Sequence, residues 1–208
     1  MMMINSTHTS NIYCHRGFWR EIDKQNSMEA FLAAERQGFS IETDLRFLNE
    51  KLVIAHDAEA INYPYFESIL ALNTSFALNI KQDGLSNRLS HFEEWIRESN
   101  SFFFDGSVPE MFRYRTVGLP HALRLSEYES SLSWETDIVW LDSFHRDWWV
   151  KNDELISLIG NKKVIVVSPE IHGRDPRYVW DFLVESRALG RFEYSICTDK
   201  PIEFATWK

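Results

Sequence analysis

Short apolar runs rich in β-branched and aromatic residues alternate along the chain with stretches whose apolar positions recur every three or four residues. The apolar runs predict eight strands, at Asn11–His15, Phe39–Asp44, Phe76–Lys81, Ser101–Asp105, His121–Leu125, Asp137–Asp142, Lys163–Ser168 and Tyr194–Thr198. The helical periodicity is clearest at Ser27–Gln37, Arg88–Ser99, Asp153–Ile159 and Pro176–Leu189. Strands that alternate with helices indicate parallel βαβ units, and eight such units can close into a barrel.

Two local patterns support the first units of this arrangement. The pair Asn26-Ser27, directly before Met-Glu-Ala-Phe, predicts a helix N-cap. The segment after the second strand predicts a hairpin, with its turn at Asn49-Glu50 and a return strand at Leu52–Ala55. We expect that return strand to bring His56 to the mouth of the barrel.

An open doubly wound sheet would show the same alternation of strands and helices. Such a sheet usually carries a Gly-rich phosphate loop after its first strand, and this sequence has none there. The first strand instead ends in His15-Arg16-Gly17, and polar residues recur where later strands end. In a (β/α)8 barrel these ends share one face, which is where active sites form. We therefore predict an α/β fold, a single (β/α)8 TIM barrel over residues 1–208.

The charge and hydropathy of the chain narrow the classes of partner. The formal net charge is −9, which disfavours a nucleic acid held by general phosphate attraction. No apolar run approaches the length that crosses a membrane, and Met1–Asn11 lacks the basic start and apolar core of a secretory signal. We therefore expect a cytoplasmic protein with no nucleic-acid partner and no transmembrane segment. A phosphate ligand would need local cations or a metal.

Carboxylate and imidazole side chains stand at the predicted strand ends. Glu42 and Asp44 are separated by one residue, so both point to the same face of the second strand. Two adjacent buried carboxylates favour a cation between them, and Mg²⁺ or Ca²⁺ suits such oxygen ligands. His15 and His56 are candidates for proton transfer, and Lys81 for a phosphate contact. Each of these residues taken alone is also compatible with an ordinary surface position.

The order of these residues resembles the glycerophosphodiester phosphodiesterase family. The resemblance rests on His15-Arg16-Gly17, Gln25-Asn26-Ser27 with Ala30-Phe31, Ile41-Glu42-x-Asp44, His56-Asp57, Asn79-x-Lys81 and Thr198-Asp199-Lys200-Pro201. It implies a metal-dependent phosphodiesterase with a (β/α)8 barrel and an acid-base pair of histidines, His15 and His56. The metal would be Mg²⁺ or Ca²⁺. The implied metal ligands are Glu42 and Asp44, and the implied phosphate contacts are Lys81 and Arg16.

Three departures from that family pattern affect the expected chemistry. Gln25 stands where family members usually have Glu. Asn79 replaces a metal carboxylate, so another ligand is needed, and Asp105 at the end of the fourth strand is our candidate. The alternative role for Asp105 is to cap the turn at Gly106-Ser107. Only Ala58–Ser75 stands where glycerol-specific members carry an inserted subdomain, so the barrel is compact and glycerol specificity is not implied.

The substrate is expected to be a small-molecule or headgroup phosphodiester, either a glycerophosphodiester or a phosphodiester-linked glycan or headgroup. Four polar residues at other strand ends are predicted substrate contacts, namely Arg124, Asp142, Glu170 and His172. The compact chain also resembles sphingomyelinase D and phosphatidylinositol-specific phospholipase C barrels, in which a substrate hydroxyl attacks phosphorus and a cyclic phosphate forms. Hydrolysis and a lyase-like reaction both stay open. Because Gln25 and Asn79 replace carboxylates of the family pattern, a second class of function stays open. In that alternative the protein is a catalytically silent barrel that binds a phosphorylated sugar or lipid headgroup.

Overall fold

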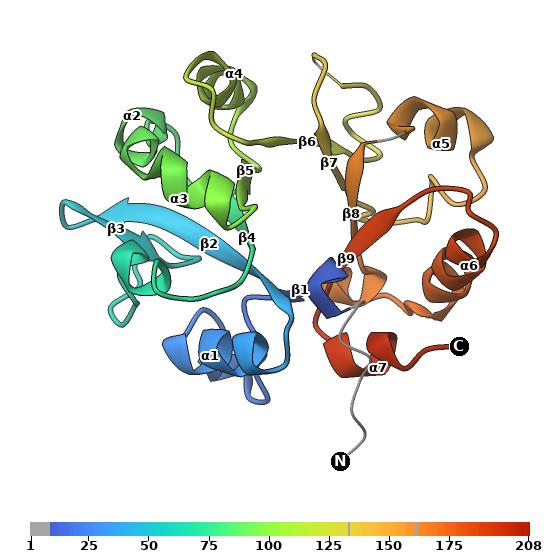
Figure 1. The fold of residues 1–208 in the computed structure, drawn as a ribbon, viewed down its shortest axis with the longest axis horizontal. Coiled ribbons are helices and arrows are strands. Elements are labelled where there is room, and N and C mark those ends of the chain that lie inside the picture. The colour runs from blue at the N-terminus through green and yellow to red at the C-terminus, as the bar shows by residue number, and fades with distance from the viewer. Residues whose placement is uncertain (1–8, 133, 161) are drawn as a thin grey trace.

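Eight parallel strands form the wall of a barrel in the computed structural model, which describes residues 9–132, 134–160 and 162–208. The strands are β1 (Ile12–His15), β2 (Ser40–Leu48), β4 (Phe76–Ile80), β5 (Phe102–Phe104), β6 (Ala122–Leu125), β7 (Ile138–Leu141), β8 (Lys163–Val167) and β9 (Tyr194–Thr198). They are hydrogen-bonded in the order β5-β4-β2-β1-β9-β8-β7-β6. A parallel bridge between Phe103 and His121 joins the two ends of this order, so the ring is nearly closed (Figure 1). The fold is a (β/α)8 TIM barrel, as predicted.

All eight predicted strands are confirmed, and only β2 differs from its predicted bounds by more than one residue. It continues past Asp44 because it pairs with the antiparallel strand β3 (Lys51–Ile54) in the predicted hairpin. Asn49 and Glu50 form the turn, both with positive φ (48° and 62°). Two consecutive residues with positive φ are typical of the tight hairpin turns that match strand twist.

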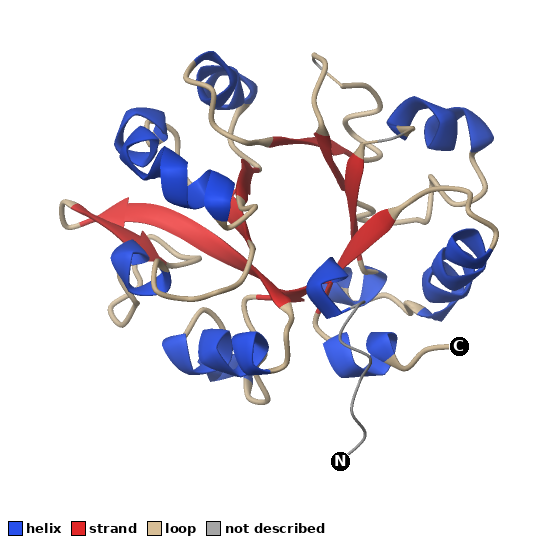
Figure 2. Ribbon diagram, in the orientation of Figure 1, coloured by secondary structure: helices blue, strands red, loops and turns tan. Residues whose placement is uncertain are grey.

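Helices surround the barrel on its outer side (Figure 2). They are α1 (Met28–Arg36), α2 (Ser86–Leu89), α3 (Glu93–Glu98), α4 (Val108–Thr116), α5 (Asp153–Ile159), α6 (Arg177–Ala188) and α7 (Pro201–Ala205). The loops also contain short 3-10 helices, η1 (Thr9–Asn11), η2 (Ile22–Lys24), η3 (Phe66–Ile69), η4 (Ser90–Phe92) and η5 (Pro169–His172). The helix α1 begins at the predicted Asn26-Ser27 pair, where Ser27 is the N-cap and its side chain accepts a hydrogen bond from the Ala30 N–H at 3.2 Å.

One predicted helix, Arg88–Ser99, is broken in the structure. Its residues are divided between α2, η4 and α3. The break lets two aromatic rings, Phe92 and Trp95, pack edge-on against Phe66 of η3, with ring centroids 5.0 Å and 5.8 Å away. Tertiary packing therefore overrides the helical periodicity of this stretch.

Alternation along the strands divides the core into two layers. One cluster of buried residues fills the barrel interior and contains Tyr13, Ala77, Phe102, Phe104, Ala122, Trp140, Ile165, Val167 and Cys197. The neighbouring strand residues, such as Ile41 and Val139, pack outward in a second cluster with the helices. Within the barrel Phe104 stacks on Trp140, with ring centroids 3.9 Å apart. The interior is therefore a packed core, and polar groups at inward positions have room only at the barrel ends.

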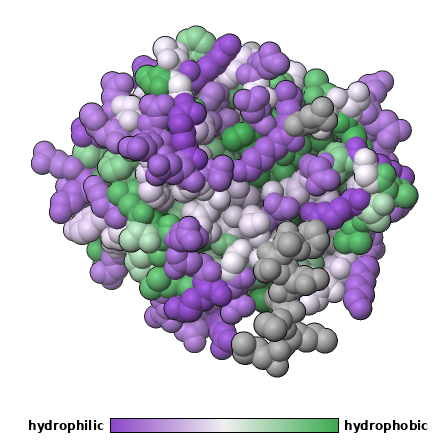
Figure 3. All heavy atoms as spheres, viewed as in Figure 1, coloured by the Kyte–Doolittle hydropathy of each residue, from purple (hydrophilic) through white to green (hydrophobic). Residues whose placement is uncertain are grey.

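Polar side chains cover most of the face seen in Figure 3, with smaller apolar areas between them. Among the described residues, no helix is long and apolar enough to cross a membrane.

Candidate active site

A cleft of about 440 Å³ opens where the parallel strands end. Ten of the twelve site residues predicted from the sequence line it, namely His15, Arg16, Glu42, Asp44, Asn79, Lys81, Asp105, Arg124, Asp142 and His172. The remaining two, His56 and Glu170, do not line it.

Strand alternation explains why residues far apart in sequence converge on this cleft. Tyr13 and Ala77 point into the barrel core, so the next inward positions on β1 and β4 are His15 and Asn79. The same period of two, counted from the core position Trp140 of β7, leads to Asp142. Side chains at these positions lie above the packed interior, at the carboxyl ends of the strands.

His15 is oriented by Asp199, which follows β9. The His15 Nδ1 atom lies 2.8 Å from Asp199 Oδ1, and the Nε2 atom lies 3.9 Å from Glu42 Oε2. Burial of the ring opposes its charged form, but the Asp199 hydrogen bond and the Glu42 charge outweigh burial and raise the pKa of His15 above 6.5. The carboxylate of Asp199 therefore favours a proton on Nδ1 and leaves Nε2 to exchange a proton with a ligand.

Glu42 is a buried carboxylate with few groups around it that stabilise its negative charge. Its Oε2 atom accepts the backbone N–H of Arg16 at 3.2 Å, and its residue is only 2% exposed. Burial, followed by repulsion from Asp44, raises the pKa of Glu42 to about 7. A carboxylate in this condition gains stability from any cation that enters the cleft.

Asp44 is instead surrounded by hydrogen-bond donors. Its oxygens lie 3.1 Å from Arg16 Nε and 3.1 Å from Lys81 Nζ, and Asn26 Nδ2 donates to it at 2.7 Å. The Asn26 amide is fixed in turn by the Thr43 hydroxyl, which donates to its oxygen at 2.7 Å. Burial disfavours the charged form of Asp44, but Lys81 and Arg16 outweigh it and lower the carboxyl pKa below 3.8.

Asn79 and Asp105 form the next group along the cleft. Asn79 Nδ2 donates to Asp105 Oδ2 at 3.3 Å, while the buried Asn79 Oδ1 has no hydrogen-bond partner among the described residues. Asp105 has φ 64° and also pairs with Arg124 at 3.1 Å. Burial raises the pKa of Asp105 despite the charge of Arg124. The side chain of Asp105 therefore points into the cleft, and the following helix α4 is capped by Ser107 instead.

Arg124, Phe144 and the pair Asp142–His172 line the side of the cleft formed by β6, β7 and β8. The Arg124 guanidinium also contacts Glu129 and lies 5.6 Å from the centroid of the Phe144 ring. His172 Nε2 lies 2.8 Å from Asp142 Oδ1. This side of the cleft therefore offers a cation, an aromatic face and a second imidazole.

Glu170 and His56 have other surroundings. Glu170 accepts hydrogen bonds from the hydroxyls of Ser168 and Thr198 and from the Asp199 N–H at 3.2 Å, so it fixes the segment that carries Asp199. The His56 imidazole is 46% exposed and pairs with Asp57 at 2.7 Å. The His56 role in acid-base catalysis stays a prediction.

The oxygen atoms that line the cleft fit a hard divalent cation as its ligands. No three His, Cys, Asp or Glu side chains among the described residues form a metal-binding group by themselves. However, Asp44 and Asn79 face each other across the β2–β4 ladder, and Asn79 supplies a buried amide oxygen without a partner. Together with Glu42, whose pKa is raised, they form a set of oxygen ligands in which Asp44 is paired with Arg16 and Lys81 while Glu42 and the Asn79 oxygen have no cationic partner within 3.5 Å among the described residues.

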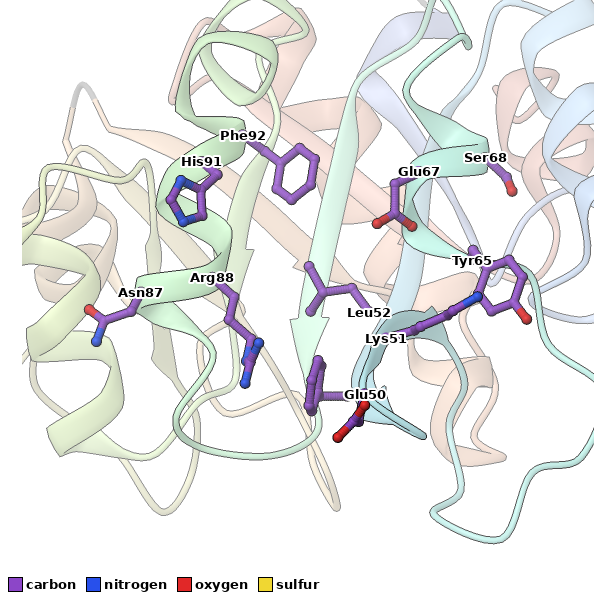
Figure 4. Close-up of a pocket in the computed structure, with 11 residues that line it drawn as sticks. Glu50, Lys51, Leu52, Tyr65, Glu67, Ser68, Asn87, Arg88, His91 and Phe92 are labelled. Atoms are coloured by element: carbon purple, nitrogen blue, oxygen red, sulfur yellow. The ribbon is translucent and has the colours of Figure 1, made fainter.

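A larger hollow, of about 760 Å³, lies elsewhere on the molecule. It is bounded by the β2–β3 hairpin, η3 and the segment from α2 to η4 (Figure 4). Its charged side chains include Lys51, which lies over the Tyr65 ring at 4.4 Å, and Arg88, which lies over the Phe47 ring at 3.9 Å. None of the predicted site residues lines this hollow, so the cleft at the strand ends is the candidate active site.

Comparison with solved structures identifies the fold. The crystal structure of a glycerophosphodiester phosphodiesterase from Agrobacterium tumefaciens str. C58 aligns with a TM-score of 0.67 and 15% sequence identity, over 94% of this chain and 99% of that one. A protein assigned as a glycerophosphoryl diester phosphodiesterase, from Silicibacter pomeroyi DSS-3, aligns with a TM-score of 0.59 and 12% identity, over 89% and 96%. The chain has the fold of the glycerophosphodiester phosphodiesterases. No protein-family model and no curated protein sequence matches it.

Two residues of this glycerophosphodiester phosphodiesterase fold were missed by sequence reasoning. Asp199 belongs to the closing Thr-Asp-Lys-Pro motif, but its contact with His15 spans 184 positions and follows only from β1 and β9 being neighbours. Phe144 lies three residues beyond β7, and no pattern in the sequence distinguishes it from the other aromatic residues nearby. The motif was a usable signal for the first residue, and none existed for the second.

Proposed function

We propose that this protein is a metal-dependent phosphodiesterase that acts in the cleft at the strand ends. The observation that carries the proposal is the arrangement of His15, which is oriented by Asp199, beside the buried carboxylate Glu42. Two cationic groups, Arg16 and Lys81, line the same cleft. Positioned imidazole, cationic groups and oxygen ligands for a metal are what phosphodiester cleavage requires. The fold shared with solved glycerophosphodiester phosphodiesterases supports the same chemistry.

The metal would be Mg²⁺ or Ca²⁺, with Glu42, Asp44 and Asn79 as ligands and Asp105 as the candidate further ligand. When bound, it would stabilise negative charge on the phosphate oxygens. Lys81 and Arg16 would contact the phosphate, and the Nε2 atom of His15 would exchange a proton with the reacting oxygen.

His56 is the second acid-base residue that the family resemblance implies. The predicted substrate contacts are Arg124, Asp142, Glu170 and His172, of which all but Glu170 line the cleft.

The substrate that we propose is a small-molecule or headgroup phosphodiester, a glycerophosphodiester or a phosphodiester-linked glycan or headgroup, met in the cytoplasm. The negative net charge of the chain disfavours a nucleic acid. Hydrolysis by water and attack by a substrate hydroxyl, which yields a cyclic phosphate, both use the same residues.

Turnover of bis-p-nitrophenyl phosphate with Mg²⁺, Mn²⁺ or Ca²⁺ tests the proposal. We expect activity that a chelator abolishes and that His15→Ala reduces by about 10²–10⁴-fold, the usual contribution of a general acid or base. His91→Ala is the matched control because His91 is exposed and lies outside the cleft. Binding of the diester without turnover under all three metals would favour a catalytically silent barrel that binds a phosphorylated sugar or lipid headgroup.

Calorimetric titration with Mg²⁺ or Ca²⁺ tests the ligand set. Asn79→Asp places a third carboxylate among the oxygen donors and should tighten metal binding. Asp105→Asn should weaken binding, because Asp105 either binds the metal or orients the Asn79 amide through their 3.3 Å hydrogen bond. Unchanged affinity in both variants would contradict the proposed site.

A further inference from the structure

A half-buried arginine, Arg46, joins two segments on which the proposed reaction depends. It stands on β2, two positions beyond Asp44. Its Nε atom donates to the backbone carbonyl of His56 at 2.9 Å, and its Nη1 atom donates to the backbone carbonyl of Lys81 at 3.0 Å. One guanidinium therefore holds the segment that follows β3 to the segment that follows β4.

The two segments lie along opposite edges of β2. The Asp44 carbonyl accepts the Ala55 N–H at 3.0 Å, and the next carbonyl along the strand, that of Leu45, accepts the Lys81 N–H at 3.1 Å. Successive carbonyls of a strand point to opposite edges, so one segment stands on each side of β2. The Arg46 side chain spans the strand and connects the two edges.

The chemistry of the guanidinium suits this bridge. In the part of the chain that the structure describes, both side-chain hydrogen bonds of Arg46 go to backbone carbonyls and no carboxylate forms an ion pair with it. A charged donor makes a stronger hydrogen bond to a carbonyl than a neutral donor does. A guanidinium also presents its N–H groups in one rigid plane, whereas a lysine ammonium gathers its donors on one flexible atom. Arginine can therefore hold both carbonyls at once.

The hold on the His56 carbonyl matters because the His56 ring is open to solvent. The imidazole is 46% exposed, and its Nδ1 atom pairs with Asp57, whose side chain is 74% exposed. The place of the ring therefore depends on the backbone from which it extends. At the other end of the bridge, Lys81 lines the cleft, and its Nζ atom lies 3.1 Å from Asp44. The bridge fixes where the His56 backbone stands relative to Lys81.

We propose that Arg46 is a positioning residue of the phosphodiesterase reaction, which holds His56 in place relative to Lys81 for its exchange of a proton with the substrate. The inference rests on the proposed function, in which His56 is the second acid-base residue. Arg46 does not line the cleft, so it acts through His56 and not by contact with the substrate. Misplacement of a reacting group by about 1 Å can cost about 10²-fold in rate, so a backbone tether of this kind affects catalysis.

A double-mutant cycle separates this role from a purely structural one. We compare kcat and KM for methyl phenyl phosphate, whose basic phenolate leaving group makes the rate sensitive to proton transfer, with the metal that supports turnover. Arg46→Ala should lower kcat by about 10–10²-fold when His56 is present. In the His56→Ala background the same substitution should lower kcat by less than about twofold. KM should change less than kcat, because Lys81 keeps its pairing with Asp44.

Two further variants complete the comparison. Arg46→Lys should fall between wild type and Arg46→Ala, because its ammonium can donate to either carbonyl but lacks the fork that reaches both. The same cycle with this milder substitution guards against a loss of activity that comes from unfolding. Arg115→Ala is the matched control and should equal wild type, since Arg115 is exposed on α4 and lies outside the cleft.

The outcomes distinguish the role of Arg46 from the proposed function. Equal losses of kcat from Arg46→Ala with and without His56, or wild-type kcat in Arg46→Lys, would overturn the positioning role and leave the proposed function standing. Turnover of bis-p-nitrophenyl phosphate but not of methyl phenyl phosphate would also overturn that role, because His56 would then give no help to a basic leaving group. Absence of turnover on both esters with Mg²⁺, Mn²⁺ and Ca²⁺ would refute the proposed function, and the role of Arg46 with it.

Discussion

Gly17 controls how the end of β1 meets helix α1, directly after His15 and Arg16. Its φ is +90°, and a Cβ atom at this position would lie 2.8 Å from Ala30 Cβ and 3.0 Å from Phe31 Cδ1. The Gly17→Ala substitution therefore lowers the free energy of unfolding in two ways. The left-handed backbone costs an L-residue about 1–2 kcal/mol. Forcing a methyl group into a packed contact costs about 1–3 kcal/mol more. We expect the free energy of unfolding to fall by about 2–5 kcal/mol.

A matched glycine separates the two costs. Gly84 has the same φ of +90°, and a Cβ atom there would meet nothing within 4 Å. Gly84→Ala should therefore lose only the backbone part, about 1–2 kcal/mol. Ala30→Gly removes the methyl group that Gly17→Ala would meet, so in a double-mutant cycle the pair should be less destabilised than the sum of the single variants.

Urea unfolding followed by circular dichroism measures wild type, the three single variants and the double variant. The difference between Gly17→Ala and Gly84→Ala gives the packing cost, and the cycle gives the coupling between positions 17 and 30. Equal losses in the two glycine variants to within about 0.5 kcal/mol, together with zero coupling, would refute the close approach of β1 and α1.

Three other substitutions test local features of the fold by the same urea method. Glu127 accepts hydrogen bonds from the backbone N–H groups of Phe144, His145 and Arg146 at 2.9–3.0 Å. Burial opposes the charge of Glu127, but these hydrogen bonds outweigh it and lower the carboxyl pKa from 4.5 to about 2. Glu127→Gln should lower stability by about 1–2 kcal/mol at neutral pH. Because the folded pKa is depressed, that difference is complete above about pH 4.5 and disappears as pH falls through about 2; a difference independent of pH would contradict the contact. Ser27→Ala removes the α1 cap and should lower the free energy of unfolding by about 1 kcal/mol. Unchanged stability in this variant would contradict the cap. Tyr114→Phe removes a buried hydroxyl that has no partner among the described residues, so stability should stay equal or rise, and a clear loss would reveal a missing partner.

The barrel could be predicted from the sequence because its strands obey a short-range rule. Each strand is an apolar run, and polar residues such as His15, Asn79 and Asp142 follow at a period of two from core positions. The convergence of these residues needs only the additional premise that parallel strand ends share one face. The Glu42-x-Asp44 pair is the clearest case, since both side chains line the cleft.

The parts that could not be predicted depend on contacts between distant segments. The orientation of His15 depends on Asp199, and the break between α2 and α3 depends on the rings that pack against Phe66. The contact of the His56 ring with Asp57 lies beyond the end of β3, and a hairpin pattern does not specify it. Pattern reasoning places an element more reliably than it places a side chain beyond the end of that element.

The charges that line the cleft explain why a phosphodiester would need a further cation there. Three cationic side chains line it, Arg16, Lys81 and Arg124, against five carboxylates, Glu42, Asp44, Asp105, Asp142 and Asp199. Counted with all five carboxylates ionised and both histidines neutral, the lining carries a formal excess of two negative charges, and each cation already pairs with a carboxylate. An anionic diester would meet net repulsion in such a site. One divalent metal ion balances that excess, so the acidic lining and the requirement for metal in the proposed reaction have the same physical origin.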